Sequence, residues 1–421
     1  MTTIMSNARS SQSVTEVKKQ VNSRSLKAQI DEISERVKEY FSDSKAILIT
    51  NKKMLHEYVD RIIESGIAAI DTETTGLDRI SDHIVGSSLY FPGGYEAYIP
   101  NKHIMPLFNT PYSDQLTYED VQEEYQRIAD ANVKLIFANV DFDLAMIFKD
   151  FKVDFIKNVF YDVIIAWRCL KENEKDNALK VLFNKYVMKG KGDPKKFRDF
   201  FSPDQFPYCS PAVAKLYAAN DAKITFDLAM WQIPFIQQNN EKCQKNHLES
   251  ISKLIWGVEF PMIEVCQNMH RRGIYLEKSV ADILRQRYNS VLDAENKKMS
   301  DMVDDILNDS RYQAPTRAPF PNGASFNPNS TPHVSWLIYD LMKLGDGNTS
   351  GTGKEILSTF NEPITKQILK VRSLVTLIGT FVDKLPNEVW NDNRIHCRFN
   401  QIGADTGRMS SSNPKTRILG L

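Results

Sequence analysis

The stretch Gly66–Leu77, GIAAIDTETTGL, is an apolar run that ends in two acidic residues, Asp71 and Glu73. The residues before Asp71 are apolar and lie between a glycine and a Thr/Gly-rich turn, which predicts a strand covered on both faces. Because side chains alternate along a strand, Asp71 and Glu73 point to the same side. Such carboxylates repel each other unless a proton or cation lies between them, and oxygen ligands favour a divalent metal. Alone, the pair is equally consistent with two solvated acids at a strand end.

Helix-like and strand-like patterns alternate around this stretch, which indicates an α/β domain. Helical spacing of apolar residues predicts helices, and short apolar runs bounded by turn residues predict strands. A hairpin is expected where two β-rich runs flank Pro92-Gly93-Gly94. The predicted helices cover residues 26–41, 53–65, 117–131, 140–148, the segment up to residue 188, and 211–231; the strands cover 46–50, 66–77, 83–91, 95–100 and 134–138.

Length and composition describe an ordinary globular chain of two or three domains, with 421 residues of which 42% are hydrophobic. The 53 basic and 53 acidic residues balance, so nucleic acid would have to bind through local clefts rather than a global basic field. The five cysteines lack the spacing of a zinc site, which favours a reducing compartment.

No apolar run approaches the ~20 residues of a membrane span, so we expect no membrane partner. We expect a cytoplasmic location, which would be the host cytoplasm if the chain is encoded by a phage. Residues 1–25 are rich in Ser, Thr and Asn and are interpreted as a disordered leader.

Two further segments carry acids on predicted helices. Asn139 can cap the helix that follows the strand at residues 134–138, and Asp143 lies one turn further on the same face. On the helix that begins at Pro211, Tyr217 and Asp221 stand at positions i and i+4 and therefore project together. An acid in the first turn of a helix is common for electrostatic reasons alone, so Asp143 needs partners to indicate a site.

Asp71, Glu73, Asp143 and Asp221, with Tyr217, resemble the DEDD group of 3′→5′ exonucleases with a ribonuclease H-like fold, in the subtype with tyrosine in its third motif. The matching strings are DTE, NVDFD and YAAND, in this order along the chain. The resemblance implies a mixed sheet flanked by helices and two-metal hydrolysis of a phosphodiester.

The same resemblance implies roles for individual residues. Asp71, Glu73 and Asp221 would hold one metal ion, Asp71 and Asp143 a second, and Tyr217 would orient the attacking water. Two Mg²⁺ or Mn²⁺ ions are expected, because all the ligands are oxygens. Leu77 corresponds to a leucine that wedges against the terminal base, although it could equally pack in the core. Asn139 either contacts the substrate or only caps its helix.

The second half of the chain resembles the polymerase region of family A DNA polymerases. The string WGVEFPMIEVCQNMHRRGI is similar to its opening, and the helical pattern at 276–307 is similar to the thumb helices. NGASFNPNS would place Asn327 and Ser330 at a duplex phosphate. In DTGRMSSSNP, Arg408 would contact the minor groove of a primer-template, and the further candidates are Thr406, Gln401 and Lys384.

After Pro414 the chain reads KTRILGL and departs from the family, whose three catalytic palm motifs would follow. As written, the chain is not expected to polymerise. Our hypothesis is a reading frame interrupted by an intron, an intein or a frameshift.

These patterns predict three parts: a leader with a short helix at 1–45, a 3′→5′ exonuclease at 46–236, and an incomplete polymerase thumb and palm at 237–421. The expected function is proofreading within a family A DNA polymerase used in replication. The expected partners are a single-stranded 3′ end, a primer-template duplex and a separate C-terminal polymerase part. Two alternatives remain: a DNA-binding subunit of a split polymerase, and a free-standing DEDD ribonuclease.

Overall fold

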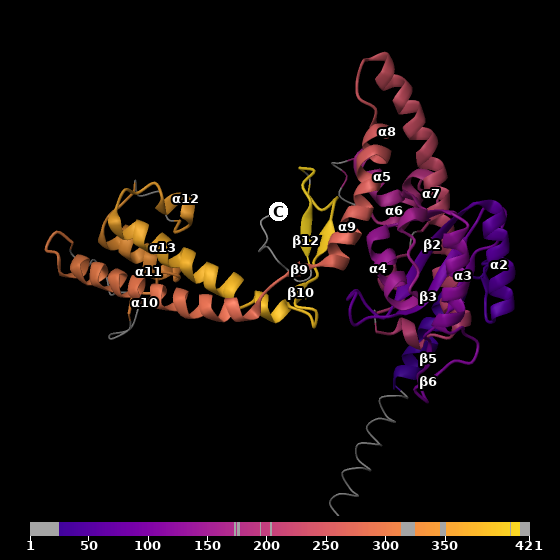
Figure 1. Ribbon diagram of the computed structural model, residues 1–421, viewed down its shortest axis with the longest axis horizontal. Helices are drawn as coiled ribbons and strands as arrows, with labels where there is room; N and C mark the ends of the chain where they lie inside the picture. The colour runs from indigo at the N-terminus through magenta and orange to yellow at the C-terminus, as the bar shows by residue number, and fades with distance from the viewer. Residues whose placement is uncertain are drawn as a thin grey trace, which may run out of the picture. The chain divides into compact units, whose positions relative to one another are not determined.

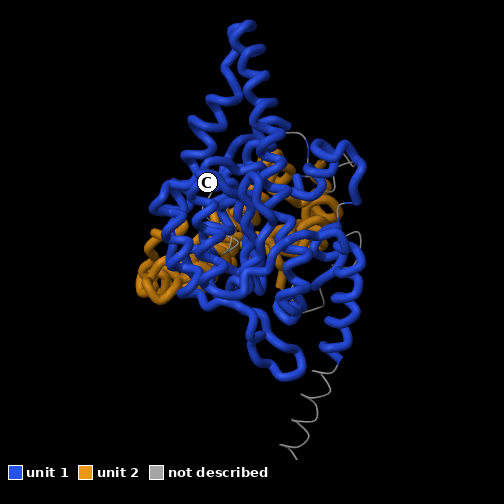
Figure 2. Tube along the Cα trace, turned by 90° about the vertical axis from the view of Figure 1, so that its right-hand side faces the viewer, with its two compact units in different colours: residues 1–269, 399–410 blue, residues 270–398, 411–421 orange. Residues whose placement is uncertain are grey.

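The described residues of the computed structural model form two compact units, 1–269 with 399–410 and 270–398 with 411–421 (Figure 2). The structure describes residues 25–171, 174, 177–193, 195–202, 204–312, 325–345, 351–404 and 406–412. Residues 1–24 of the predicted leader, and the end of the chain after Pro414, lie outside these residues.

A six-stranded sheet forms the centre of the first unit (Figure 1). Its order is β1 (Ile47–Leu48), β4 (Ala97–Pro100), β3 (Ile84–Tyr90), β2 (Ile67–Thr74), β7 (Lys134–Phe137) and β8 (Val159–Asp162). Strand β2 pairs antiparallel with β3 and parallel with β7, so the sheet is mixed, as expected. The predicted hairpin is confirmed by the antiparallel pairing of β3 with β4. Every residue of β3 from Ile84 to Leu89 is buried, so both faces are covered at the centre.

Helices surround this sheet in the first unit. In chain order they are the helix over residues 25–40, α2 (Lys52–Ser65), α3 (Tyr118–Asp130), α4 (Val140–Phe151), α5 (Val163–Leu170), α6 (Leu179–Leu182), α7 (Pro211–Lys245), α8 (Ile251–Leu254) and α9 (Phe260–Arg272). Helix α2 ends where predicted, because Gly66 adopts a left-handed conformation with φ 66° and its N–H bonds the carbonyls of Ile62 and Ile63. Smaller pieces are the pair β5 (Ile104–Met105) and β6 (Thr110–Pro111).

Two predicted helix boundaries were wrong. Helix α7 continues past Trp231 and Pro234 to Lys245, because the apolar pattern goes on and Ile236 is fully buried in the core. The helix predicted up to Met188 is instead the four-residue α6 followed by a π-helical turn, Phe183–Val187. The polar run that follows Leu170 offers no apolar face to a helix.

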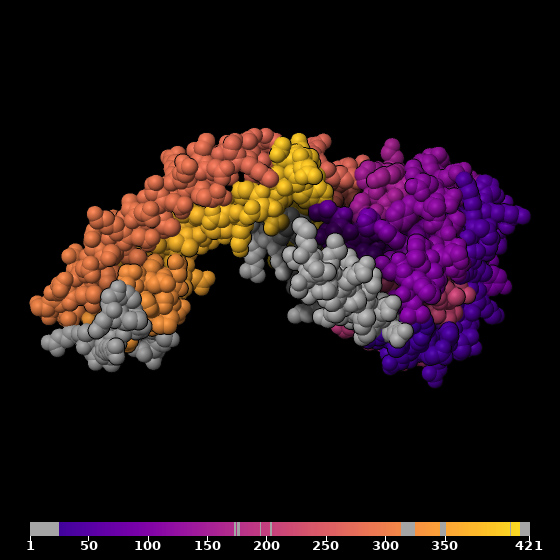
Figure 3. All heavy atoms as spheres, turned by 90° about the horizontal axis from the view of Figure 1, so that it is seen from below, coloured from indigo at the N-terminus to yellow at the C-terminus, as the bar shows by residue number. Residues whose placement is uncertain are grey.

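The second unit is mainly helical. Its long helix α10 (Lys278–Asn308) agrees with the pattern at 276–307, and α13 (Pro363–Leu377) packs along it, as the orange and yellow-orange surfaces in Figure 3 also show. Helices α11 (Thr331–Ser335) and α12 (Lys354–Leu357) complete this apolar cluster with the π-helical turn Trp336–Leu341.

Four short strands complete the later part of the chain: β9 (Ile274–Tyr275), β10 (Arg394–Ile395), β11 (Arg398–Asn400) and β12 (Ser410–Ser412). Among the described helices, none is both long enough and apolar enough to cross a bilayer.

Candidate active site

Three acidic side chains from two elements meet beside the sheet. Asp71 and Glu73 lie on β2, and Asp221 lies on α7, which packs against β2 and β3. One carboxylate oxygen from each residue lies within 4.8 Å of the other two. Asp71 and Glu73 keep part of their surface open to solvent, whereas Asp221 is buried. The structure therefore brings together three of the four acids that the sequence singled out.

Asp143, the fourth acid, lies next to the same strand but outside this group of three. Its Oδ1 accepts hydrogen bonds from the backbone N–H and the hydroxyl of Thr72, at 3.1 and 2.6 Å. It is close enough to Asp71 for its charge to raise the pKa of that carboxyl. Helix α4 therefore holds Asp143 at the edge of the acid cluster.

The acids share poorly solvated surroundings that favour their neutral forms. Desolvation, reinforced by the neighbouring carboxylates, raises the pKa of Asp71 well above its usual range and that of Glu73 to about 8. Burial raises the pKa of Asp143 to about 7, although the bonds from Thr72 act in the opposite direction. Desolvation also raises the pKa of Asp221, against the lowering effect of Lys180. When these carboxylates are ionised they repel one another, and a bound cation would reduce that repulsion.

The donor set fits a hard divalent cation. All the converging ligand atoms are carboxylate oxygens, which Mg²⁺ and similar ions prefer, and no histidine or cysteine belongs to this group of three described residues. Partial exposure of Asp71 and Glu73 leaves a path by which an ion and water could reach the oxygens.

Tyr217 lies one helical turn before Asp221 and is buried in an aromatic cluster. The ring centres of Phe41 and Phe201 lie 6.2 and 5.4 Å from its own, and the rings of Phe197, Phe200 and Phe206 surround it. Burial and the charge of Asp221 raise the pKa of the Tyr217 hydroxyl above its ordinary value, so the hydroxyl stays protonated at neutral pH. Packing thus fixes the ring, and the charges of Asp221, Glu73 and Asp71 act on its hydroxyl.

Lys180 is a site residue that the sequence analysis missed. Its Nζ lies 2.9 Å from Asp221 Oδ1 and 3.6 Å from the centre of the Tyr217 ring. The only local signal was a lysine inside the apolar run of α6, which is also the pattern of an ordinary surface residue. Only the packing of α6 on α7 reveals its position.

The prediction that the Asn139 side chain caps α4 was wrong. Asn139 occupies the N-cap position with φ 73°, but its side chain makes no capping hydrogen bond. Asp162 performs this function instead, since its Oδ2 accepts from Val140 N at 2.6 Å while its Oδ1 accepts from Ile164 N and Ile165 N at the start of α5. Asp162 therefore has a structural role at the starts of α4 and α5.

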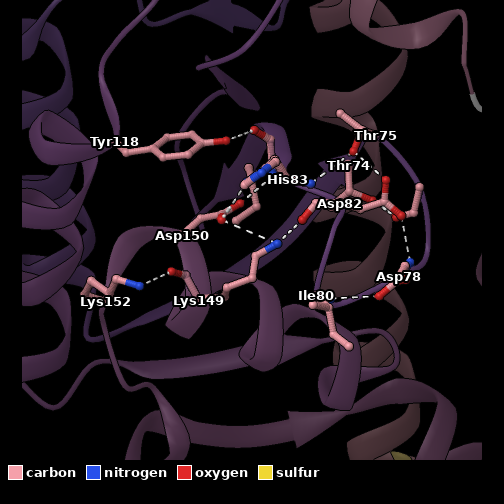
Figure 4. Close-up of polar contacts among 12 residues, drawn as sticks. Thr74, Thr75, Asp78, Ile80, Asp82, His83, Tyr118, Lys149, Asp150 and Lys152 are labelled. Carbon is pink, nitrogen blue, oxygen red and sulfur yellow. Dashed lines mark hydrogen bonds and ion pairs between the residues drawn. The ribbon is translucent and has the colours of Figure 1, made fainter. Parts of the chain in front are cut away.

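Leu77 lies on the loop that follows β2 and is 80% exposed, which excludes core packing. Asp82 holds this loop, because its carboxylate accepts from the Thr75 hydroxyl and the Asp78 N–H, each at 2.7 Å (Figure 4). Lys149 on α4 donates to the Asp82 carbonyl. An exposed leucine next to the acids thus stands on a restrained loop.

The candidates in the polymerase-like half have different surroundings. Ser330 caps α11 by accepting from His333 N at 3.4 Å, and Asn327 Oδ1 accepts from Asn329 N at 2.9 Å. The Gln401 amide donates to the carbonyl and the carboxylate of Glu259, both at 2.7 Å. The exposed candidates are Asn327, Lys384, Thr406 and Arg408.

Comparison with known proteins gives two family matches. Residues 46–230 match the model of a 3′-5′ exonuclease, and residues 295–417 match the model of DNA polymerase family A. DNA polymerase I of Pseudomonas aeruginosa is 24% identical over 85% of this chain and 37% of its own length. The DNA polymerase of Escherichia phage T5 is 25% identical over 86% of this chain and 42% of its own length. The chain thus spans less than half the length of either relative.

A solved structure has the same fold over much of its length. It is the POL domain of Pol1 from M. smegmatis in a complex with DNA primer-template and dNTP, with a TM-score of 0.61 at 15% identity. The match covers 89% of this chain and 56% of that one. The two family matches therefore show a 3′-5′ exonuclease domain over residues 46–230, which carries the acid cluster, and a segment of DNA polymerase family A over residues 295–417.

Proposed function

We propose that this chain removes nucleotides from the 3′ end of single-stranded DNA, as the proofreading exonuclease of a family A DNA polymerase. The observation that carries the proposal is the convergence of Asp71, Glu73 and Asp221 within 4.8 Å on a partly open face of the sheet. The match of residues 46–230 to the exonuclease model supports it.

Two Mg²⁺ or Mn²⁺ ions are the proposed cofactors. Asp71, Glu73 and Asp221 would hold one ion, and Asp71 with Asp143 the other. When bound, such ions supply a water-derived nucleophile at neutral pH and stabilise the leaving oxygen. Tyr217, fixed by its aromatic neighbours, would orient the attacking water through its protonated hydroxyl.

Leu77 and Asn139 are the proposed contacts to the terminal nucleotide. The high exposure of Leu77 on a restrained loop suits a side chain that packs against a base. Asn139 stands at the N-cap position of α4, the helix that carries Asp143.

A primer-template duplex is the second proposed DNA partner. Residues 295–417 match the polymerase model, and the POL domain of Pol1 from M. smegmatis was solved with a DNA primer-template. Exposed Lys384, Thr406 and Arg408 suit phosphate or groove contacts. Asn327, Ser330 and Gln401 would have to contact DNA while keeping, or exchanging, their present hydrogen bonds.

We further propose the parts 1–45, 46–236 and 237–421 as leader, exonuclease domain and thumb with the start of the palm. A separate C-terminal polymerase part is a proposed partner. The five free cysteines support a reducing compartment, for which we propose the cytoplasm, that of the host if the gene is from a phage.

The test is release of 3′-terminal nucleotides from end-labelled single-stranded DNA, with Mg²⁺ and with a chelator. Wild type should trim only with Mg²⁺, and Asp221→Ala should lose at least about 100-fold in rate because a ligand is gone. Asp227→Ala is the matched control, since Asp227 lies on the same helix but pairs with Lys223. Trimming that persists in the chelator or in Asp221→Ala would contradict the proposal.

The same assay separates the two alternatives. Faster trimming of RNA than of DNA would favour the free-standing ribonuclease. Tight primer-template binding without any cleavage would favour the DNA-binding subunit.

A further inference from the structure

We propose that the ammonium group of Lys180 neutralises the acid cluster when metal is absent, and that it must leave Asp221 when a divalent cation binds. The inference rests on the proposed function, because it assumes that the acids are a metal site. It assigns Lys180 as a positioning residue that lowers the apparent affinity of the site for metal.

The geometry places a nearly dehydrated positive charge at the cluster. Lys180 Nζ lies 2.9 Å from Asp221 Oδ1, and the two side chains are only 14% and 13% exposed. The same nitrogen lies 3.6 Å from the centre of the Tyr217 ring, a cation–π distance. The ammonium is therefore held between an acid and an aromatic face, at one of the oxygens that a metal would use.

Charge balance explains why a cation is needed there. Asp71, Glu73 and Asp221 bring carboxylates within 4.8 Å of one another in a poorly solvated place, where ionised groups are costly unless paired. The Lys180 charge acts on all three acids, since it lowers the pKa of each against the effect of burial. A resident ammonium thus keeps the metal-free site compatible with a folded protein.

The surroundings give Lys180 a place to go. Lys180 also lines a cavity of about 280 Å³, together with Asn184, Asn220 and the acids Glu96 and Asp193. Its side chain is a flexible four-carbon stem, and it comes from the short helix α6 rather than from a strand of the sheet. The ammonium can therefore swing from Asp221 toward polar and acidic groups of the cavity without leaving the protein.

A competing cation has a measurable consequence. If Lys180 must be displaced, removing its charge strengthens metal binding and weakens the metal-free fold. If instead Lys180 supports the metal-bound site, removing it weakens metal binding. The two possibilities differ in sign, so a binding measurement separates them without any assay of activity.

The experiment is a calorimetric titration of the whole chain with Mn²⁺, together with its melting temperature in a chelator. Lys180→Met should bind Mn²⁺ at least about tenfold more tightly than wild type, as expected for a close charge pair. In the chelator, its melting temperature should be lower than that of wild type. Adding Mn²⁺ should raise its melting temperature by more than that of wild type. Lys180→Arg, which keeps the charge, should bind Mn²⁺ like wild type.

Lys223→Met is the matched control, because Lys223 lines the same cavity but pairs with Asp227. Its Mn²⁺ affinity should stay near the wild-type value. If the Mn²⁺ affinity of Lys223→Met rises as much as that of Lys180→Met, the loss of any nearby positive charge has the same effect, and the proposal is overturned. Unchanged or weaker binding in Lys180→Met overturns it as well.

Two further outcomes are informative. If Lys180→Met is unfolded in the chelator but folds with Mn²⁺, the proposal is supported, since the ion supplies the missing charge. If Lys180→Met is unfolded both in the chelator and with Mn²⁺, the same titration is done on Lys180→Gln and judged by the same criteria. Failure of wild type to bind Mn²⁺, or binding that survives Asp71→Ala, would instead count against the proposed function itself.

Discussion

Asp162 joins two helices through a single carboxylate. Its two oxygens accept three buried backbone N–H groups, from Val140 at the start of α4 and from Ile164 and Ile165 at the start of α5. Because α4 carries Asp143, this one side chain connects the helix framework to the acid cluster. A residue with no direct chemical role can therefore determine where a candidate metal ligand lies.

Asp162→Ala should lower the free energy of unfolding by about 3 kcal/mol, since buried donors lose their acceptors at two helix ends. Urea denaturation of the metal-free protein measures this loss. Asp130→Ala, at an exposed acid that pairs with Gln126, should change stability by less than about 0.5 kcal/mol. Equal effects in the two variants would show that the Asp162 bonds contribute little.

The acids should give the metal-free protein an unusual pH dependence. Burial raises the pKa of Glu73 from 4.5 to about 8 and that of Asp143 from 3.8 to about 7. A raised pKa means that the folded state binds protons more tightly than the unfolded state, so this contribution to stability is lost as pH rises through the folded values. In a chelator, unfolding free energy should fall between about pH 5 and pH 8.

Urea denaturation in chelator across this pH range measures the effect, and Glu73→Gln should flatten the curve because the residue no longer titrates. Saturating Mg²⁺ should also reduce the loss at high pH. Stability that rises between pH 5 and pH 8 in the wild type would contradict the assigned surroundings of these acids.

At the scale of elements, the helix over residues 25–40 supports the site from outside the predicted exonuclease domain. Its Ile30, Ile33 and Val37 are buried in the same apolar cluster as Tyr217. Phe41, which follows the helix, packs edge-to-face on the Tyr217 ring. This helix therefore contributes to the aromatic surroundings of a candidate catalytic residue.

Val37→Ala should destabilise the fold by about 2 kcal/mol, because Val37 is fully buried and its loss leaves a cavity. It should also slow trimming more than it weakens DNA binding, since a looser Tyr217 holds its hydroxyl less well. Lys38→Ala, on the exposed side of the same helix, is the control. If Val37→Ala is destabilised but trims at the wild-type rate, this helix does not support the site.

The loop after β2 offers a second prediction at this scale. Asp82→Ala removes the acceptor for Thr75 and Asp78, so the loop that presents Leu77 should loosen and the KM for single-stranded DNA should rise about tenfold. Leu77→Ala should have a similar effect if the leucine contacts the terminal base. In the double variant the two effects should not add, because both act through one contact. Full additivity of the two effects on KM would show that Asp82 does not act through Leu77.

Elements determined by local patterns were predictable. Strand β2, helix α2 with its Gly66 cap and the hairpin β3–β4 each follow from a short run of residues and a turn signal. The end of α7 was not predictable, because burial of Ile236 overrides a proline that usually stops a helix. Propensity is local, whereas burial depends on the rest of the chain.

At the scale of the whole molecule, the acids come from segments far apart in the chain and meet only because the sheet and α7 bring them together. The motif strings singled out these acids, and the fold explains how Asp71, Glu73 and Asp221 converge. Lys180 could not be found in this way, since its role depends on the packing of α6 against α7. A sequence motif identifies ligands more readily than the counter-charge that balances them.

The neutral net charge of the chain also limits how it can bind DNA. Since no global field attracts the phosphate backbone, the proposed DNA binding would depend on local groups, for which exposed Arg408 and Lys384 are the candidates, and on the metal-loaded acid cluster. The rate of trimming should therefore depend more on the concentration of divalent cation than on that of monovalent salt.

Diffraction from crystals soaked in Mn²⁺, with data collected at the manganese absorption edge, tests the metal site most directly. We expect two anomalous peaks roughly 3.5–4 Å apart, one among Asp71, Glu73 and Asp221 and one between Asp71 and Asp143. A map with no peak among these acids, from crystals that bind Mn²⁺ elsewhere, would contradict two-metal trimming of DNA ends by this chain.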